Sequence, residues 1–278
     1  MTDEPPAPGG TDYVSSYFPT VTIRKDERSL STRLPLRPGL RDSAGALRIG
    51  AAMFAVDVAT GIASGVTVLE RDMWVVTTDL DVHLTAPVDT GPLRVEVEVL
   101  RSGATTVVAA FSLHDDGADR PVGGGTATSR PFPATFDRSR LAFPVGEEFS
   151  TATGGPTVSP TDAAPIAAQL GFVQDEDGSV QLVIDDRLRN PWGILHGGVT
   201  GCLVDAAGEL AASAAVGGPV RVASQLVRYL APGRVGPVRG EPRVIAVQHG
   251  GALVEVRVVD QGADRRLIAV GSLTALAR

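Results

Sequence analysis

The amino-acid sequence predicts an α+β protein built from two similar units in tandem, each a bent antiparallel sheet wrapped around one long helix. Two observations predict this fold. Each half of the chain has one apolar segment with helical spacing followed by several strand-like segments, in the same order in both halves. Short sequences also recur between the halves at a nearly constant offset. The length of 278 residues allows one large core or two ordinary ones.

The first half begins with residues 1–18, which we expect to be a flexible tail because they contain Pro5, Pro6, Pro8 and Gly9 before any periodic pattern. The N-terminal unit then covers 19–130. Its opening segment, 21–40, is irregular and rich in arginine. A helix is expected over 47–63, where apolar side chains recur at helical spacing: Ala51, Ala55, Val58 and Ile62. Strands rich in Val and Thr are expected at 74–84, 93–101, 105–114 and 122–129.

A connection is expected over 131–164, because proline recurs throughout it and Gly154-Gly155 lies in its middle. The C-terminal unit covers 165–278 and repeats the order of the first. A strand is expected at 180–184 and a helix at 197–216. Further strands are expected at 220–230, 236–248, 253–260 and 267–276.

Three matches support the repeat. Residues 117–120, Gly-Ala-Asp-Arg, recur 145 residues later at 262–265, and Ala86-Pro87 recurs at the same offset as Ala231-Pro232. Asp57 lies 148 residues before Asp205. We therefore predict a tandem duplication. A single unit would leave one sheet edge and a helix surface uncovered, so the two units are expected to pair as a pseudo-dimer within the chain, with further homo-oligomers left open.

The composition argues against several kinds of function. A net charge of −7 argues against a nucleic-acid surface, and 43% hydrophobic with 21% charged residues is typical of a soluble globular protein. Cys202 is the only cysteine, which rules out an internal disulfide and a multi-cysteine metal site. With no signal-like start and no apolar stretch of 18 residues, we expect a cytoplasmic protein without a membrane partner. No metal site is expected, since His83, His114 and His249 lack ligand spacing.

The residues suited to catalysis cluster at the start of the second predicted helix. Asn190 precedes His196-Gly197-Gly198 by six residues, and Asp205 follows His196 by nine. Gly197 and Gly198 lie where backbone N–H groups have no partner within the helix, so they can donate to a developing oxyanion. Asn190 could hold the attacking water or the carboxylate, and an Asp could act as nucleophile or as general base toward water. These groups suffice for thioester hydrolysis without a metal.

Helical spacing gives each predicted helix two faces. In the second helix one stripe is expected to face the sheet: Val199, Leu203, Ala206 and Leu210. The other face carries small side chains and the carboxylate, which lets a second helix or a ligand approach closely: Gly198, Gly201, Asp205, Gly208 and Ala212. The corresponding face of the first helix carries Gly50, Met53 and Asp57. Each helix therefore offers one carboxylate from a comparable position.

The spacing from Asn190 through His196-Gly197-Gly198 to Asp205, with the Ala/Gly-rich helix that follows, resembles that of the hotdog-fold acyl-CoA thioesterases, in the phenylacetate-pathway branch. The resemblance covers roughly 165–278 and implies a double hotdog with sites at the interface of the two units. It also implies that coenzyme A is bound only as part of an acyl-CoA substrate, with no other cofactor. The N–H of Gly197 would be the oxyanion donor, and His196 would mainly shape the turn.

In that family the catalytic acid usually comes from the facing unit, so the resemblance implies that Asp57 completes the site of Asn190, His196 and Gly197. The reciprocal site would join Asp205 to residues 47–50. There Arg48 and Ile49 replace His and Gly, and Asp42 lies where the Asn would be. That second site is expected to be altered or inactive, although Asp205 remains a candidate for the catalytic acid.

Gly198 and Arg228 are candidates for substrate contact. Arg228, like Arg221 and Arg234, could meet the phosphates of coenzyme A from a strand. Glu209 is expected to be a solvated or interface acid, and Cys202 a buried structural thiol.

Two other functions remain open beside thioester hydrolysis. Hydration or dehydration of an acyl-CoA occurs on the same fold, and Asn190-Pro191 with a nearby His is faintly similar to hydratase-type hotdogs. The Gly-Asp that precedes Asn-Pro there is replaced by Leu188-Arg189. A non-catalytic acyl-ligand binding protein is the third class, because half of the duplicated site has changed.

Overall fold

The computed structural model describes residues 14–134, 143–150, 163–248 and 250–278. The first half contains β1 (Val21–Arg24), β2 (Ser29–Leu34), α1 (Ile49–Val66), β3 (Met73–Leu84), β4 (Leu93–Ser102), β5 (Val107–Asp115), β6 (Arg120–Pro133) and β7 (Glu148–Phe149). The second contains α2 (Ile166–Gln169), β8 (Val173–Gln174), β9 (Val180–Leu182), α3 (Gly197–Val216), β10 (Val220–Tyr229), β11 (Val238–Gln248), β12 (Gly251–Asp260) and β13 (Arg266–Ala277). Short 3₁₀ helices lie at Val14–Tyr17, Pro38–Leu40, Leu69–Arg71, Asp116–Ala118 and Asp186–Leu188.

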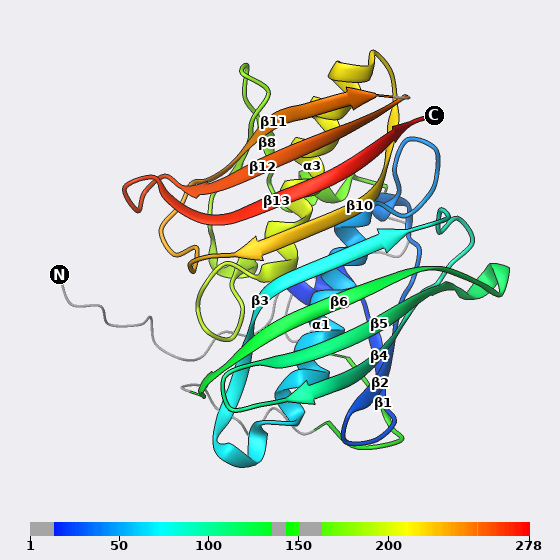
Figure 1. The fold of residues 1–278 in the computed structure, drawn as a ribbon, viewed down its shortest axis with the longest axis vertical. Coiled ribbons are helices and arrows are strands. Elements are labelled where there is room, and N and C mark those ends of the chain that lie inside the picture. Colours follow the sequence, from blue (N-terminus) through cyan, green and yellow to red (C-terminus); the bar gives the residue numbers. More distant parts are fainter. Residues whose placement is uncertain (1–13, 135–142, 151–162, 249) are drawn as a thin grey trace.

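The strands of the described residues form one sheet of thirteen, in the order β7-β1-β2-β4-β5-β6-β3-β10-β13-β12-β11-β9-β8. Neighbouring strands are antiparallel throughout. The helix α1 packs against β2 to β6, and α3 packs against β9 to β13. In Figure 1 both helices lie behind the strands of their own half. The predicted fold class, two units that each wrap an antiparallel sheet around a long helix, is confirmed.

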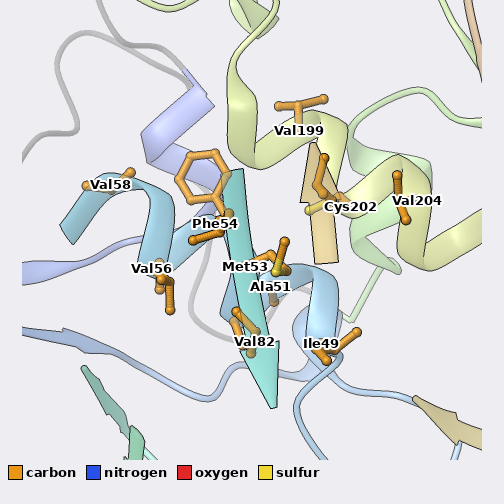
Figure 2. Packing of buried hydrophobic residues seen from close by; sticks show 14 of the residues in the cluster. Ile49, Ala51, Met53, Phe54, Val56, Val58, Val82, Val199, Cys202 and Val204 are labelled. Carbon is orange, nitrogen blue, oxygen red and sulfur yellow. The ribbon is translucent and has the colours of Figure 1, made fainter. Parts of the chain in front are cut away.

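The two helices also pack against each other. Figure 2 shows Met53 and Phe54 of α1 in one cluster with Val199 and Cys202 of α3. Nearly every side chain of α1 is buried, and Asp57 is its one charged residue. Because burying a charge without compensation is costly, a lone carboxylate in such a helix needs polar neighbours or a function.

The halves join where β3 pairs with β10, from Asp79 opposite Arg228 to His83 opposite Ser224. At the centre of this pairing Leu226 lies opposite Asp81, and the two are themselves 145 positions apart. One continuous sheet therefore runs through both units, with α1 and α3 meeting on its inner side.

A matched pair of loops supports the predicted repeat. The carboxylate of Asp115 accepts hydrogen bonds from the backbone N–H groups of residues 89, 90 and 91, at 2.6 to 3.1 Å. Asp260, 145 positions later, accepts in the same way from residues 234, 235 and 236, at 2.8 to 3.0 Å. The two units therefore share local chemistry as well as element order, while the duplication itself stays a prediction.

Three expectations about the segments outside the long helices and strands need correction. Residues 1–13 lie outside the described part, but Val14, Tyr17 and Phe18 are buried, with Phe18 fully so, and the flexible tail cannot extend to residue 18. The segment 21–40 contains β1 and β2, where short strands escaped detection because Arg24 and Arg33 interrupt the apolar pattern.

The expected connection over 131–164 is also more structured than its prolines suggested. Its first residues end β6, and β7 within it pairs with β1. The stretches 135–142 and 151–162 lie outside the described residues.

The expectation that no 18-residue apolar stretch occurs is wrong. Within the described residues, α1 and α3 are both long and apolar enough to cross a membrane by length and composition alone. The core helix of a globular fold passes the same test, and these windows are 89% and 56% buried inside the protein.

Candidate active site

The loop before α3 is built by local hydrogen bonds that present the start of the helix. The side-chain oxygen of Asn190 accepts from the backbone N–H groups of Trp192, at 3.0 Å, and Ile194, at 3.4 Å. This arrangement is an Asx turn, which fixes the backbone without help from the rest of the chain. Asp42, 148 positions earlier, accepts in the same way from Ala44 and Ala46. The oxygen of Asn190 is thus committed to its own loop, and its predicted contact with water or a carboxylate stays a prediction.

His196 caps α3. Its Nδ1 accepts a hydrogen bond of 3.0 Å from the N–H of Gly198, one of the groups that the first helical turn leaves without a partner. In this arrangement Nδ1 carries no proton, so the imidazole proton lies on Nε2. The hydrogen bond supports the expectation that His196 shapes the turn rather than transferring protons. Among the described residues, none accepts a hydrogen bond from the N–H of Gly197.

Asp57 of α1 lies directly against this helix start. A Cβ atom placed on Gly197 would be 2.8 Å from Oδ2 of Asp57, so only glycine allows the carboxylate to come so close. The same oxygen lies 3.5 Å from Nδ1 of His196. The other oxygen, Oδ1, accepts a hydrogen bond of 2.7 Å from the hydroxyl of Thr77 on β3. Asp57 is 8% exposed, and the chain brings it together with Gly197 and His196 as predicted.

A stack of three rings bounds the site. The ring of Phe54, one helical turn before Asp57, stacks on His196 with centroids 4.7 Å apart. Phe18 stacks on the other side of Phe54 at 3.8 Å. A Cβ atom on Gly198 would lie 2.5 Å from this ring of Phe54, which explains the second glycine of the motif. Gly198 therefore serves close helix packing, and its predicted contact with substrate stays a prediction.

Sequence reasoning missed two polar residues of the site. Besides Thr77, the hydroxyl of Tyr229 at the end of β10 donates a hydrogen bond of 3.0 Å to the carbonyl of Gly197. Burial raises the pKa of the Tyr229 hydroxyl well above its ordinary value, and the nearby Asp57 carboxylate adds to the effect. Strand alternation from the buried Val227 would have placed Tyr229 on the inner face. The irregular pairing between Thr77 and Asp79 shifts the alternation of β3, so Thr77 could not be placed in this way. Nothing in the sequence indicates which helix atoms the two side chains meet.

The reciprocal position has the same backbone and different chemistry. A Cβ atom on Gly50 would lie 2.9 Å from Oδ2 of Asp205, which mirrors the approach of Asp57 to α3. Here, however, Nε of Arg48 donates to Oδ2 of Asp205 at 3.0 Å, and the same guanidinium pairs with Glu209. Arg48 stands where His196 stands in the other site. Asp205 is 3% exposed, so this carboxylate is neutralised inside the protein.

The pKa values around Asp205 reflect this ion cluster. Burial lowers the pKa of Arg48, but the two carboxylates outweigh it and hold the pKa above its ordinary range. Burial, followed by repulsion from Asp205, raises the pKa of Glu209. Burial also raises the pKa of Cys202, whose thiol donates to the carbonyl of Gly50 at 3.2 Å. The expectation of a buried structural thiol agrees with this environment.

Two of the arginines proposed for phosphate contact have neighbours other than Asp57. Arg228 is exposed and pairs with Asp79 of β3 at 2.8 Å, on the face of β10 opposite to Tyr229. Arg221 lines a small cleft beside Arg48, Asp205 and Glu209. Phosphate contacts by these side chains stay predictions. No group of three or more potential metal ligands occurs within the described residues, and His249 lies outside them.

Two predictions about the faces of α3 are wrong. Leu210, assigned to the stripe that faces the sheet, is 39% exposed. Gly201 faces Met53 of α1 as expected, but Gly208, assigned to the same face, lies against Leu273 of β13. The close contact between the helices extends from Gly197 to Asp205 and includes the turn that carries the site.

Comparison with known proteins gives a family and a fold. Residues 193–265 match the family model described as the thioesterase superfamily. A protein from Novosphingobium aromaticivorans, assigned as a thioesterase, superposes with a TM-score of 0.62 at 18% identity, over 92% of this chain and 98% of its own. One from Lactobacillus plantarum, assigned as an oleoyl thioesterase, gives 0.61 at 11%, over 90% and 96%.

The tesB protein of Mycobacterium avium subspecies paratuberculosis gives a TM-score of 0.61 at 13% identity, over 92% of this chain and 95% of its own. At these identities the likeness shows a shared fold over nearly the whole length. A comparison with curated protein sequences gave no match.

Proposed function

We propose that the chain is a member of the thioesterase superfamily, whose family model its residues 193–265 match, and that it hydrolyses an acyl-CoA thioester at one site, formed by Asp57 and the N-terminal turn of α3. The observation that carries this proposal is the contact between the two. The Asp57 carboxylate comes so close to Gly197 that no side chain fits there. A base and an oxyanion donor therefore face each other across the interface of the two units.

The proposed reaction uses both parts of this contact. The thioester oxygen accepts a hydrogen bond from the N–H of Gly197, and the positive end of α3 stabilises the charge that develops. Asp57 removes a proton from water as the water oxygen attacks the carbonyl carbon. When the tetrahedral intermediate collapses, the C–S bond breaks and the CoA thiolate leaves. The thiolate takes up the proton that Asp57 had removed from water, so the products are a carboxylic acid and CoA.

Thr77 supports the base in this scheme. Because its hydroxyl donates to Oδ1 of Asp57, the oxygen that faces Gly197 is Oδ2. A second route remains open, in which Oδ2 attacks the carbonyl carbon itself and water later hydrolyses the mixed anhydride. A single turnover in ¹⁸O-labelled water tests for the second route. Label enters the Asp57 carboxylate when water attacks the Asp57 carbonyl of the anhydride, and it never enters in the first route, so labelled Asp57 would establish nucleophilic attack.

The reciprocal position is proposed to be inactive. Its carboxylate is bound by Arg48. The cleft beside it contains Leu84 and Val222, whose side chains offer no hydrogen bond to Asp205, together with the charged Arg221 and Glu209. An ion pair in place of the capping His leaves Asp205 without the freedom to accept a proton from water. Each chain is therefore proposed to have a single active site.

A thiol-release assay over short-chain, long-chain and aryl acyl-CoAs tests the proposal. Asp57→Asn is expected to lower kcat about 10³-fold, the middle of the range for loss of a general base. Asp205→Asn, the matched variant of the other helix, is expected to keep kcat within about threefold in the folded protein. Loss of turnover in Asp205→Asn alone would reverse the assignment. If acyl-CoA binds without cleavage, the chain is a binding protein, and formation of a hydroxyacyl-CoA would indicate a hydratase.

A further inference from the structure

Two inward side chains of β10 hold the beginning of α3. The hydroxyl of Tyr229 donates to the carbonyl of Gly197 at 3.0 Å, and Nε2 of Gln225 donates to the carbonyl of Gly201 at 2.8 Å. The two donor residues lie four positions apart in β10, and the two acceptor residues lie four positions apart in α3. The two hydrogen bonds therefore connect the strand to the helix over about one helical turn. Both carbonyls belong to the turn that presents the Gly197 N–H.

This turn is intrinsically weak. Three of its first five residues are Gly197, Gly198 and Gly201, and glycine destabilises a helix relative to alanine because the unfolded chain has more freedom to lose. The glycines are nevertheless required, since Cβ atoms there would meet Asp57, Phe54 and Met53 within about 3.1 Å or less. Close approach of the catalytic carboxylate thus depends on a helix start that needs support from outside.

The reciprocal position lacks both the weakness and the support. Helix α1 begins Ile49-Gly50-Ala51-Ala52, with a single glycine. At the 145-residue offset, Tyr229 and Gln225 correspond to Leu84 and Leu80 of β3, whose side chains have no hydrogen-bond donor. The polar pair therefore occurs only beside the helix that carries the proposed oxyanion donor.

Burial of this polar pair is energetically unfavourable. Gln225 is fully buried, and its Oε1 has no hydrogen-bond partner within the described residues. An unsatisfied buried amide oxygen is unfavourable, and leucine at the equivalent position shows that the fold accepts an apolar side chain there. Stability of the sheet alone does not explain a glutamine at this position.

We propose that Tyr229 and Gln225 are positioning residues, which hold the glycine-rich first turn of α3 so that the Gly197 N–H stays directed at the thioester oxygen. The expected effect on catalysis rests on the proposed function. The anchoring of α3 by the two side chains is independent of that function. Neither residue contacts the reacting atoms, since both side chains bond to backbone carbonyls of α3. Each acts through the backbone of α3.

Steady-state kinetics test the catalytic consequence. Tyr229→Phe keeps the ring and removes the donor, and it is expected to lower kcat about tenfold with KM changed less than about twofold, because substrate still binds while the oxyanion is held less well. The control is Tyr17→Phe, which removes a tyrosine hydroxyl that accepts from Arg187 at 3.3 Å. It is expected to leave both constants unchanged. Equal kcat in Tyr229→Phe and wild type would overturn the proposal.

Amide hydrogen exchange in the free protein gives a second readout that needs no activity. In Tyr229→Phe and in Gln225→Leu the Gly201 amide is expected to exchange about threefold faster or more, while amides in the middle of α1 keep their rates. Unchanged exchange at Gly201 in both variants would refute the anchoring. If wild type cleaves no thioester, the proposed function fails, and the exchange rates still decide whether β10 holds the turn.

Discussion

The carboxylate of Asp57 and the backbone of Gly197 lie in direct contact, although they come from different units and are 140 positions apart. The contact depends on the absence of a side chain, because a Cβ atom at Gly197 would be 2.8 Å from Oδ2. The same pair supplies the proposed base and the proposed oxyanion donor. A change at this contact should therefore affect catalysis more than folding.

Gly197→Ala tests this directly. The added methyl group is expected to displace Asp57 and to lower kcat about 100-fold, comparable to losing an oxyanion donor. Gly61→Ala is the control, because a Cβ atom at that helical position of α1 meets nothing within 4 Å. It is expected to keep full activity and to raise the free energy of unfolding by about 0.5 to 1 kcal/mol. Full thioesterase turnover in Gly197→Ala would contradict the site.

Arg48 is expected to be a structural residue of the reciprocal position. Arg48→Met leaves the buried Asp205 and the half-buried Glu209 without their cation, so the free energy of unfolding should fall by about 3 kcal/mol. Adding Asp205→Asn and Glu209→Gln should restore most of that loss, since no uncompensated charge remains. Urea unfolding measures both changes.

The control for Arg48 is Arg228→Met. It breaks the exposed pair with Asp79 and should cost less than about 1 kcal/mol. If Arg48→Met is no more destabilising than this control, the ion cluster is not what holds the reciprocal position.

The sequence predicted the long elements well, for a physical reason. Helix α3 and the strands β3 and β10 are each ten or more residues long, so local side-chain spacing reveals them even though one irregularity shifts the alternation within each strand. The pairing of Asp57 with the motif of α3 required two further steps, the repeat and the resemblance. The Arg48–Asp205 contact joins residues 157 positions apart, and nothing in local spacing indicates it.

The sequence could not predict what depends on atomic contacts between elements. Gly208 followed the spacing of the helix-facing stripe, yet it packs against Leu273 of the sheet, and helical spacing alone does not reveal this difference. The sequence places Tyr229 in a strand, but it does not predict the hydrogen bond from its hydroxyl to the carbonyl of Gly197. Phe18 lay in a segment that its prolines marked as a tail, and a single stacking contact with Phe54 fixes it in the core.

Phe18→Ala is expected to be strongly destabilising. The ring is fully buried against Phe54, so its loss should lower the free energy of unfolding by about 3 to 5 kcal/mol. Phe132→Ala, on β6, is the matched control because that ring is 37% exposed, and it should cost about 1 kcal/mol or less. Equal urea midpoints for the two variants would show that the segment 14–18 does not contribute to the core.

Asp115 should make the stability of the first unit depend on pH. Burial raises the pKa of its carboxyl, but hydrogen bonds from the backbone N–H groups of Thr90, Gly91 and Asp89 outweigh this and hold the pKa below its ordinary value. A carboxyl with a lowered pKa in the folded state stabilises the protein above its unfolded pKa of 3.8, and that stabilisation is lost as the pH falls through the folded value.

Asp115→Asn is therefore expected to lower the free energy of unfolding by about 2 kcal/mol at pH 7 and by less at about pH 3, where the wild-type carboxyl also begins to bind a proton. Urea unfolding at the two pH values measures the difference. Asp264→Asn is the control, because Asp264 is exposed and its left-handed backbone, with φ of 53°, also suits Asn. A gap between wild type and Asp115→Asn that stays constant from pH 7 to pH 3 would mean that the backbone hydrogen bonds of this loop do not depend on the charge of Asp115.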